Sequence, residues 1–151
     1  MNLTPMALIE VVKISEDWQQ KIAHQIREEV FVKEQNVPFQ EEYDDYETQS
    51  VHFLAFYDGI ACGTARWRFT ESGIKLERFA VKKDFRDKNV GKAILEAVLA
   101  DTQKYCQEHQ KTLYLHAQVQ VVGFYEKFGF QKLGETFQEC DIWHYKMVKV
   151  F

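Results

Sequence analysis

The chain has 151 residues, of which 46% are hydrophobic and 28% charged, and its formal net charge is −4. These values predict one globular domain over residues 1–151 and exclude intrinsic disorder. An acidic chain offers no broad basic surface to nucleic acid, and no apolar run is long enough to span a bilayer. No secretory signal is recognisable, and three widely spaced cysteines suit neither a disulfide framework nor a zinc site. We therefore expect a cytoplasmic protein.

Apolar periodicity divides the first half of the chain into a helix and four strands. Residues 9–14 are predicted to form a strand, and residues 16–32 a helix that Ser15 caps. Residues 33–50 should form a loop with one short helix. The Asp58-Gly59 pair is a strong hairpin signal and begins a three-stranded antiparallel meander. The meander strands are expected at residues 51–57, 61–69 and 74–81.

The third meander strand changes parity along its length. Ile74 and Leu76 occupy even positions, whereas Phe79 and Val81 occupy odd ones. One extra residue, a β-bulge at residues 77–78, would return all four side chains to one face of the sheet. A slowly twisting strand that is buried on both faces explains the pattern equally well, so both interpretations stay open.

The second half of the chain alternates helices and strands. Residues 88–108 predict a long amphipathic helix, and residues 121–128 predict a short one that ends at Gly129. The element order β-α-β-β-β-α-β-α-β-β predicts an α/β fold, in which a mixed sheet carries helices on its faces. The remaining strands are expected at residues 112–118, 130–133 and 141–150.

A strand, a polar loop and a helix start follow one another at residues 82–91. Free N–H groups at the helix N-terminus, beside Arg86, Lys88 and Lys92, suit a phosphate or pyrophosphate, and Gly91 lets it approach the backbone. An ordinary solvated loop is the alternative. The chain lacks the P-loop, the G-x-G-x-x-G and G-x-S-x-G motifs and paired zinc histidines. Hydride transfer, serine hydrolysis and zinc hydrolysis therefore lose their usual support.

Several local sequences and the element order resemble the GNAT superfamily of N-acetyltransferases. Arg86-x-x-Asn-x-Gly91 is similar to its acetyl-coenzyme A signature, Arg/Gln-x-x-Gly-x-Gly/Ala, and GFYEKFGF at residues 123–130 to its second signature. The segment VFVKEQNVPFQEEYDDYE and the closing IWHYKM are similar to a subgroup of small GNAT proteins. Asn89 replaces the first signature glycine, but asparagine tolerates a left-handed backbone, so we expect the loop to form. The resemblance implies a cofactor site made of Phe79, Ala80, Val81, Arg86, Asp87, Lys88, Asn89, Val90, Gly91, Lys92, Ala93, Gln118, Phe124 and Tyr125.

The resemblance also implies how acetyl transfer would be catalysed. Backbone N–H groups of residues 79–81 would stabilise the carbonyl oxygen, Tyr125 would neutralise the leaving thiolate, and Glu77 would be the general base. A tyrosine on an apolar helix face usually belongs to the core, so Tyr125 has that second interpretation. Glu77 has a second interpretation as an ion-pair partner of Arg66, Arg68 or Arg78.

Three residues are candidates for contacts with the acceptor substrate: Asp44, Arg66 and His144. Asp44 belongs to an acidic run at residues 41–47, which is either a solvated loop or a negative rim that attracts a cationic amine. His144 lies on the last strand, where several GNAT proteins line the acceptor pocket, and a structural histidine fits equally well.

These observations predict an acetyl-coenzyme A-dependent N-acetyltransferase that acts on a primary amine of a small molecule or peptide. The alternative is a non-catalytic module on the same fold that binds coenzyme A or an acyl-coenzyme A. Neither function calls for a metal, a nucleic acid or a membrane. The acceptor amine and the choice between a monomer and a homodimer do not follow from the sequence.

Overall fold

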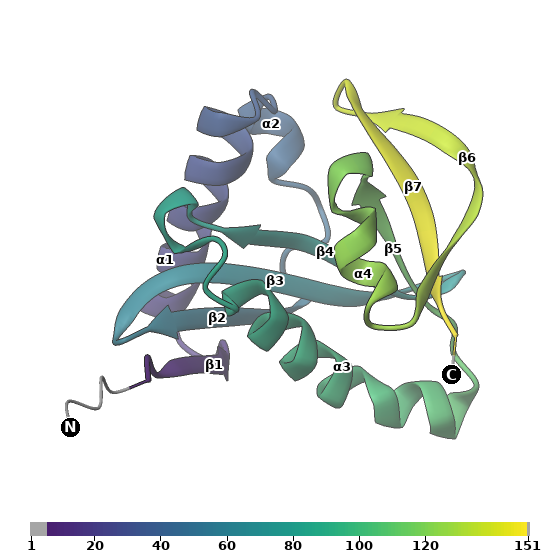
Figure 1. The fold of residues 1–151 in the computed structure, drawn as a ribbon, viewed down its shortest axis with the longest axis horizontal. Helices are drawn as coiled ribbons and strands as arrows, with labels where there is room; N and C mark the ends of the chain where they lie inside the picture. The colour runs from purple at the N-terminus through teal and green to yellow at the C-terminus, as the bar shows by residue number, and fades with distance from the viewer. Residues whose placement is uncertain (1–5, 151) are drawn as a thin grey trace.

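The computed structural model describes residues 6–150 and shows a mixed α/β fold built on one seven-stranded sheet (Figure 1). The strand order is β1-β2-β3-β4-β5-β7-β6, and the β4–β5 pair is parallel. The predicted fold class is confirmed. The strands are β1 (Ile9–Lys13), β2 (Val51–Tyr57), β3 (Ile60–Thr70), β4 (Gly73–Val81), β5 (Leu113–Gln118), β6 (Phe130–Glu139) and β7 (Ile142–Lys149).

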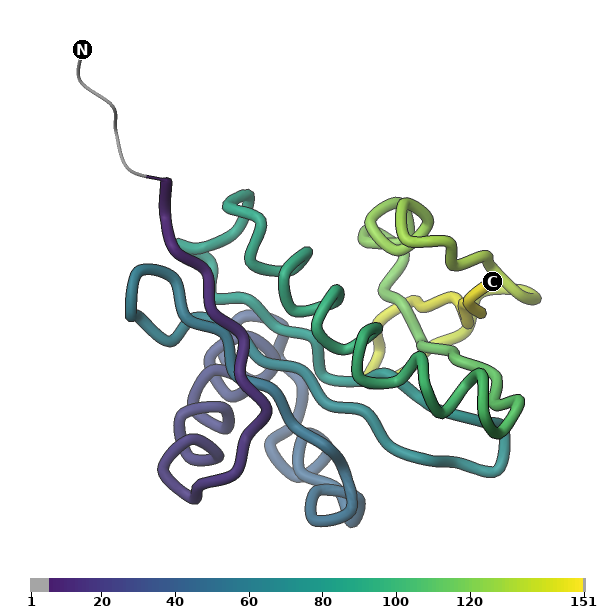
Figure 2. Tube along the Cα trace, turned by 90° about the horizontal axis from the view of Figure 1, so that it is seen from below, coloured from purple at the N-terminus to yellow at the C-terminus, as the bar shows by residue number. Residues whose placement is uncertain are grey.

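Helices cover both faces of the sheet (Figure 2). On one face, α1 (Asp17–Arg27) continues into a π-helix, η1 (Glu28–Glu34). On the other face lie α3 (Val90–His109) and α4 (Val122–Glu126). We call these the α1 face and the α3 face. Each has its own apolar core: Ala23, Ile26, Val30, Leu54 and Ala80 on the α1 face, and a larger set that includes Leu76, Ile94, Leu115 and Tyr125 on the α3 face.

The parity change in β4 is a β-bulge. Thr64 of β3 pairs with Ala80, whereas Arg66 pairs with Glu77, so β4 has one more residue than β3 between these pairs. Arg78 takes up the extra residue in a left-handed conformation, with φ of 58°. The bulge therefore brings the apolar side chains before and after it to the same face, as one of the two interpretations predicted.

Strands β4 and β5 separate part of the way along the sheet. Their pairing runs from Ile74–Leu113 to Leu76–Leu115 and no further within residues 6–150, although both strands continue beyond that point. Figure 1 shows them running apart from there. We call this gap the β4–β5 opening. Backbone N–H and C=O groups on its two edges have no sheet partner across it, and they need hydrogen bonds from elsewhere.

The first helix differs from its prediction at both ends. It is a regular α-helix only as far as Arg27, and the wider turns of η1 follow. The prediction missed this change because apolar spacing at 3.6 residues per turn does not distinguish a π-helix from an α-helix. Its N-cap is Glu16 rather than Ser15. The side chain of Gln19 accepts hydrogen bonds from the backbone N–H groups of Ser15 and Glu16, at 2.9 and 3.0 Å.

Other boundaries shift for local reasons. The predicted loop contains one short helix, α2 (Phe39–Glu42), as expected. A 3-10 turn, η3 (Val119–Val121), precedes α4 and shortens it, and Gly129 ends this segment with φ of 86°, as predicted. Strand β6 runs six residues beyond its predicted end. It is an edge strand with mostly exposed side chains, so it carries no alternating apolar pattern.

Candidate active site

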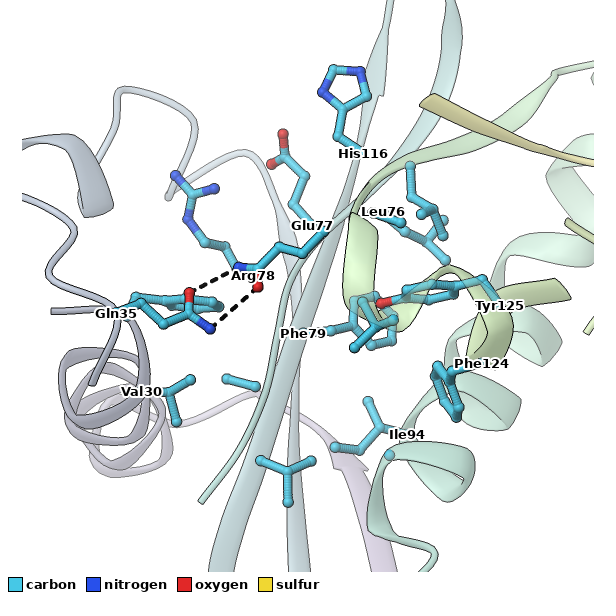
Figure 3. A pocket seen from close by; sticks show the side chains of 18 of the residues that line it. Val30, Gln35, Leu76, Glu77, Arg78, Phe79, Ile94, His116, Phe124 and Tyr125 are labelled. Carbon is cyan, nitrogen blue, oxygen red and sulfur yellow. Dashed lines mark hydrogen bonds between the residues drawn. The ribbon is translucent and has the colours of Figure 1, made fainter. Parts of the chain in front are cut away.

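A cavity of about 860 Å³ occupies the β4–β5 opening (Figure 3). It is lined from both faces of the sheet: Val30 and Phe31 of η1 contribute on the α1 face, and Phe124 and Tyr125 of α4 on the α3 face. Residues of β4 on both sides of the bulge form its wall. Its volume is in the range of sites that bind small molecules and cofactors.

The loop before α3 adopts the conformation that its sequence predicts. Asn89 is the N-cap of α3 and has φ of 67° and ψ of 14°, a left-handed backbone, so asparagine fills the place of the signature glycine without changing the turn. The N–H of Ala93 is the first to bond back within the helix, to the Asn89 carbonyl at 3.1 Å. The N–H groups ahead of it have no partner inside the helix and are suited to an anion.

Most of the predicted cofactor residues lie together. Lys88 and Ala93 do not line the cavity, and the Lys88 ammonium lies 5.7 Å from the centre of the Tyr57 ring instead. The predicted cofactor residues that do line the cavity are Phe79, Ala80, Val81, Arg86, Asp87, Asn89, Val90, Gly91, Lys92, Gln118, Phe124 and Tyr125.

Arg86 fixes this loop to two other elements. Its Nε donates a hydrogen bond to the Val81 carbonyl at the end of β4, and its Nη2 to the Glu34 carboxylate of η1, both at 2.9 Å. Gln118 makes a similar link across the opening, because its amide donates to the Gln35 side chain at 2.8 Å, next to η1. These contacts connect the loop before α3 and strand β5 to the helix on the α1 face.

Gly91 leaves space at the start of α3. A Cβ atom placed there would lie 3.7 Å from Cζ of Phe124 and 4.0 Å from Cγ2 of Val81, which are ordinary contact distances. Alanine would therefore fit without moving its neighbours. A branched side chain would extend further into the cavity and occupy the space in front of the helix N-terminus.

Beyond the bulge, the backbone of β4 directs hydrogen-bond donors into the opening. Lys82 donates its N–H to the Cys62 carbonyl of β3 at 2.8 Å. Because N–H groups alternate in direction along a strand, those of Phe79 and Val81 point away from β3. No strand within residues 6–150 pairs with β4 on that side after Leu76, so these two groups are free to bind a ligand oxygen.

Tyr125 lies at the α3 end of the cavity. Its side chain is mostly buried, with ring centres of Phe79, Phe124 and Phe130 at 6.1, 5.1 and 6.0 Å. This burial raises the pKa of the phenol, so the hydroxyl keeps its proton at neutral pH. Among residues 6–150 no hydrogen-bond partner of the hydroxyl is found, although the ring belongs to the core. Both interpretations of Tyr125 thus have support: the ring packs, and the hydroxyl is available to donate.

Asp44 and Arg66, predicted as substrate residues, lie beside the cavity in a network of ion pairs and do not line it. Arg66 is completely buried and donates hydrogen bonds to Asp44, Glu47 and Glu77 at 2.6, 2.5 and 2.8 Å. Burial by itself lowers the pKa of Arg66, but the hydrogen bonds and charges of Asp44 and Glu77 raise this pKa by more than burial lowers it. The guanidinium therefore stays charged. This network holds the loop after α2 against β3 and β4.

Three carboxylates of the acidic run are bound by arginines, whereas Glu41 and Asp45 are exposed. Glu42 is 1% exposed and accepts a hydrogen bond at 2.8 Å from Arg27, which is equally buried, and Glu47 joins the same arginine at 2.7 Å. Asp44 is held by Arg66 and by Arg78. These three carboxylates are paired with arginines, so they are not free to attract a cation. Glu41 does line the cavity.

Glu77 lines the cavity but its carboxylate is surrounded by cations. Arg66, Arg68 and Lys75 lie 2.5, 3.1 and 3.1 Å away. Although burial raises it, the hydrogen bond from Arg68 and the charges of Arg66 and Lys75 lower the pKa of Glu77 to about 2. Such a carboxylate is a weak proton acceptor for an amine. Of the two roles that the sequence left open, these surroundings favour the ion-pair partner.

The cavity-lining residues that sequence reasoning missed include two titratable ones on the last strands of the sheet, His116 of β5 and Glu139 of β6. A signal was present: in β5 the apolar side chains of Leu113, Leu115 and Ala117 belong to the core of the α3 face, so His116 between them points to the α1 face. His144 of β7, which was predicted, lines the same side of the cavity. It is mostly buried, and its Nδ1 lies 2.7 Å from the Ile142 carbonyl.

Comparisons with known proteins agree with this geometry. A family model described as "Acetyltransferase (GNAT) domain" matches residues 13–151. The N-acetyltransferase YjcF of Bacillus subtilis, of uncharacterised activity, is 39% identical over 87% of this chain and 92% of its own. These matches define an N-acetyltransferase fold and sequence class. The chain belongs to the GNAT acetyltransferase family.

Solved structures have the same fold. An acyl-CoA N-acyltransferase from Pseudomonas aeruginosa superposes with a TM-score of 0.80 at 24% identity, covering 95% of this chain and 99% of that one. Naa50 of Arabidopsis thaliana, solved with the bisubstrate analogue CoA-Ac-MVNAL, superposes with a TM-score of 0.68 at 22% identity, covering 95% and 99%. Within residues 6–150, no helix is long and apolar enough to cross a membrane, and no group of His, Cys, Asp and Glu side chains is arranged to hold a metal ion.

Replacement of Gly91 by valine should weaken the binding of acetyl-coenzyme A at least tenfold, about 1.4 kcal/mol, because the branched side chain enters the space in front of the α3 N-terminus. Isothermal titration of the folded variant measures the effect. Gly123→Val is the control: Gly123 of α4 does not line the cavity, and nothing lies within 4 Å of a Cβ placed there. Equal affinity in the wild-type protein and the Gly91 variant would exclude this loop as the pyrophosphate site.

Replacement of Glu77 by glutamine should lower the free energy of unfolding by about 3 kcal/mol at pH 7, because the buried Arg66 loses a charged partner. The pKa of Glu77, about 2 in the folded protein, lies below its ordinary value of 4.5. The stabilisation is therefore present above about pH 4.5 and is lost as the pH falls toward 2. Urea unfolding at pH 7 and at pH 3 should show the difference between variant and wild type shrinking at pH 3.

Glu96→Gln is the matched control for Glu77, because the Glu96 carboxylate is exposed and lies 3.9 Å from Lys92. Its loss should stay below about 0.5 kcal/mol. A Glu77→Gln loss as small as this one, or one that does not change with pH, would contradict the ion-pair role.

Proposed function

We propose that this protein transfers an acetyl group from acetyl-coenzyme A to a primary amine of a small molecule or peptide. The observation that carries the proposal is the cavity in the β4–β5 opening. One side of this cavity has a helix N-terminus suited to pyrophosphate, two free backbone donors and the Tyr125 hydroxyl. The other side is polar. An acyl thioester and an amine can meet there from opposite faces of the sheet.

The cofactor would bind at the loop before α3. The free N–H groups at the start of that helix and the space at Gly91 suit the pyrophosphate, and the fold neighbour Naa50, solved with a coenzyme A analogue, supports this cofactor class. The thioester would then lie beside the bulge of β4, with the N–H groups of Phe79 and Val81 directed at its carbonyl oxygen. Such donors stabilise the negative charge that develops as the amine attacks.

The leaving group and the attacking amine make opposite demands. The departing thiolate needs a proton or a hydrogen bond, which the neutral Tyr125 hydroxyl can supply. A lysine-like ammonium must first lose a proton, which costs about 4–5 kcal/mol at pH 7 for a pKa near 10.4. We assign Glu77 to the ion-pair network, so the proton from the amine goes to another group.

The free thiols of Cys62 and Cys106 suit a reducing cytoplasm.

The function is tested in two steps with the intact protein. Acetyl-coenzyme A should raise the melting temperature, because a ligand that binds only the folded state stabilises it. Release of the coenzyme A thiol should then be followed against a panel of primary amines that includes polyamines, amino acid amides and short peptides. Stabilisation by the cofactor without thiol release on any amine would support the non-catalytic binding module instead.

Replacement of Tyr125 by phenylalanine should lower kcat roughly 10²–10⁴-fold, the usual range for a general acid, while acetyl-coenzyme A affinity stays the same. The ring and its packing are kept, so the melting temperature should change little. Tyr105→Phe is the control, because that ring packs against Trp67 and Phe69, away from the cavity. Turnover of Tyr125→Phe close to that of the control would return Tyr125 to a purely structural role.

A further inference from the structure

A histidine–carboxylate pair lies on the α1 face, outside the machinery described above. Nδ1 of His116 on β5 is 2.6 Å from Oε1 of Glu139 on β6. Both residues line the cavity, and the two strands lie on either side of β7 in the sheet. The pair is therefore formed across the end of the sheet that β5, β7 and β6 build, facing the polar side of the opening.

His116 occupies the position at which the sheet splits. Leu115 is the last residue of β5 that pairs with β4, and its partner Leu76 precedes Glu77. His116 is thus the first β5 residue beyond the split (Figure 3). Because Leu115 and Tyr125 belong to the core of the α3 face, the tyrosine and this histidine reach the opening from opposite faces.

The surroundings of His116 leave one ring nitrogen available. When Nδ1 donates to Glu139, the neutral ring carries its lone pair on Nε2. Within residues 6–150 no hydrogen-bond partner of Nε2 is found. Phe137 packs edge-on at 4.9 Å between ring centres and Tyr114 lies at 6.0 Å, so the ring is held on two sides.

The other titratable groups of this face are less suited to accept a proton from an amine. Glu77 is held by three cations, as described above. His144 makes no hydrogen bond or ion pair with a carboxylate within residues 6–150, although its charge helps to lower the pKa of Glu139. Its Nδ1 faces the Ile142 carbonyl, and its ring is stacked on Phe137 at 5.9 Å. A histidine paired with a carboxylate resembles the arrangement by which serine hydrolases orient their base and stabilise its protonated form.

We propose that His116 is the general base of the acetyl transfer and that Glu139 is its positioning residue, an inference that rests on the proposed function. Nε2 of His116 takes a proton from the ammonium of the acceptor. The nitrogen lone pair then forms a bond to the thioester carbonyl carbon, and the carbon–sulfur bond breaks. The new amide nitrogen loses a second proton to solvent, and the thiolate gains one through the Tyr125 hydroxyl. One ammonium and one acetyl thioester give one amide, one thiol and one proton.

Charged groups from three strands lie around the His116–Glu139 pair. Glu139 faces it from β6, His144 and Lys146 from β7, and Lys75 and Glu77 from β4. Although burial raises it, the hydrogen bond from His116 lowers the pKa of Glu139 below its ordinary range. Glu139 therefore stays ionised at every pH at which an imidazole titrates, and its charge stabilises the imidazolium that forms during the reaction.

The experiment compares wild type, H116Q, E139Q and H109Q by thiol release with an amine that wild type acetylates, from pH 5.5 to 9.5. H116Q should lose roughly 10²–10⁴-fold in kcat at pH 7 with an unchanged KM for acetyl-coenzyme A. The limb of the kcat/KM profile that reports protonation of the base should disappear, and rising pH should partly rescue turnover as it deprotonates the amine. E139Q should lose less and move that limb to lower pH, because the imidazolium loses its counter-charge. H109Q changes an exposed histidine at the end of α3 and should match wild type.

A second readout needs no turnover. Two-bond ¹H–¹⁵N spectra of the labelled protein, with the His116 signals identified by their absence in H116Q, should show the neutral ring protonated on Nδ1. An Nε2-protonated ring, or an H116Q variant that keeps the wild-type rate and profile, overturns the assignment of the base. A different result would contradict the proposed function itself. If acetyl-coenzyme A raises the melting temperature but the wild-type protein releases no thiol with any amine of the panel, the proposed function fails and the base role fails with it.

Discussion

The separation of β4 from β5 after a short parallel pairing is the constraint on which the rest of the site depends. A continuous sheet would satisfy the backbone groups of Phe79 and Val81 with a neighbouring strand and leave no space between the two faces. The split makes those groups available, at the cost of leaving buried polar atoms that need a partner. A ligand carbonyl that enters the opening would accept hydrogen bonds from these groups. The split between β4 and β5 is therefore where a ligand gains hydrogen bonds that the sheet does not make.

Two different kinds of packing hold the opening apart. On the α3 face, Phe79, Tyr125 and Phe130 form an apolar contact between β4, α4 and β6. On the α1 face, the buried Arg27 and Arg66 bind carboxylates of α2, of the loop after α2 and of β4. Buried ion pairs add little net stability, because desolvation offsets their attraction, but removal of one partner is costly. The network therefore fixes which loop lies against the bulge more than it stabilises the fold.

The fold and the conformation of the loop before α3 could be predicted because their signals are local. Apolar periodicity marks most strands and both long helices, the parity change in β4 narrows the bulge to two residues, and Arg86-x-x-Asn-x-Gly91 lies within six positions. The ion pairs could not be predicted as a network. Arg66 binds Asp44, which precedes it in the sequence, and Glu77, which follows it, and no local pattern links these three residues. Charge patterns in a sequence do not reveal which carboxylates are buried, so the acidic run was interpreted as surface.

The pairing of His116 with Glu139 was missed for a related reason. Glu139 lies beyond the predicted end of β6, on an edge strand whose exposed side chains give no periodic signal, and 23 residues separate it from the histidine. Only the strand order β5-β7-β6 brings them to one face. That order also determines the division of the site: the thiolate would leave on the apolar α3 face, beside Tyr125, whereas the amine would arrive on the polar α1 face. Because the arginines already hold Glu42, Asp44 and Glu47, a cationic amine that enters from the α1 side of the opening would meet Glu41 and Glu139, which line the cavity there.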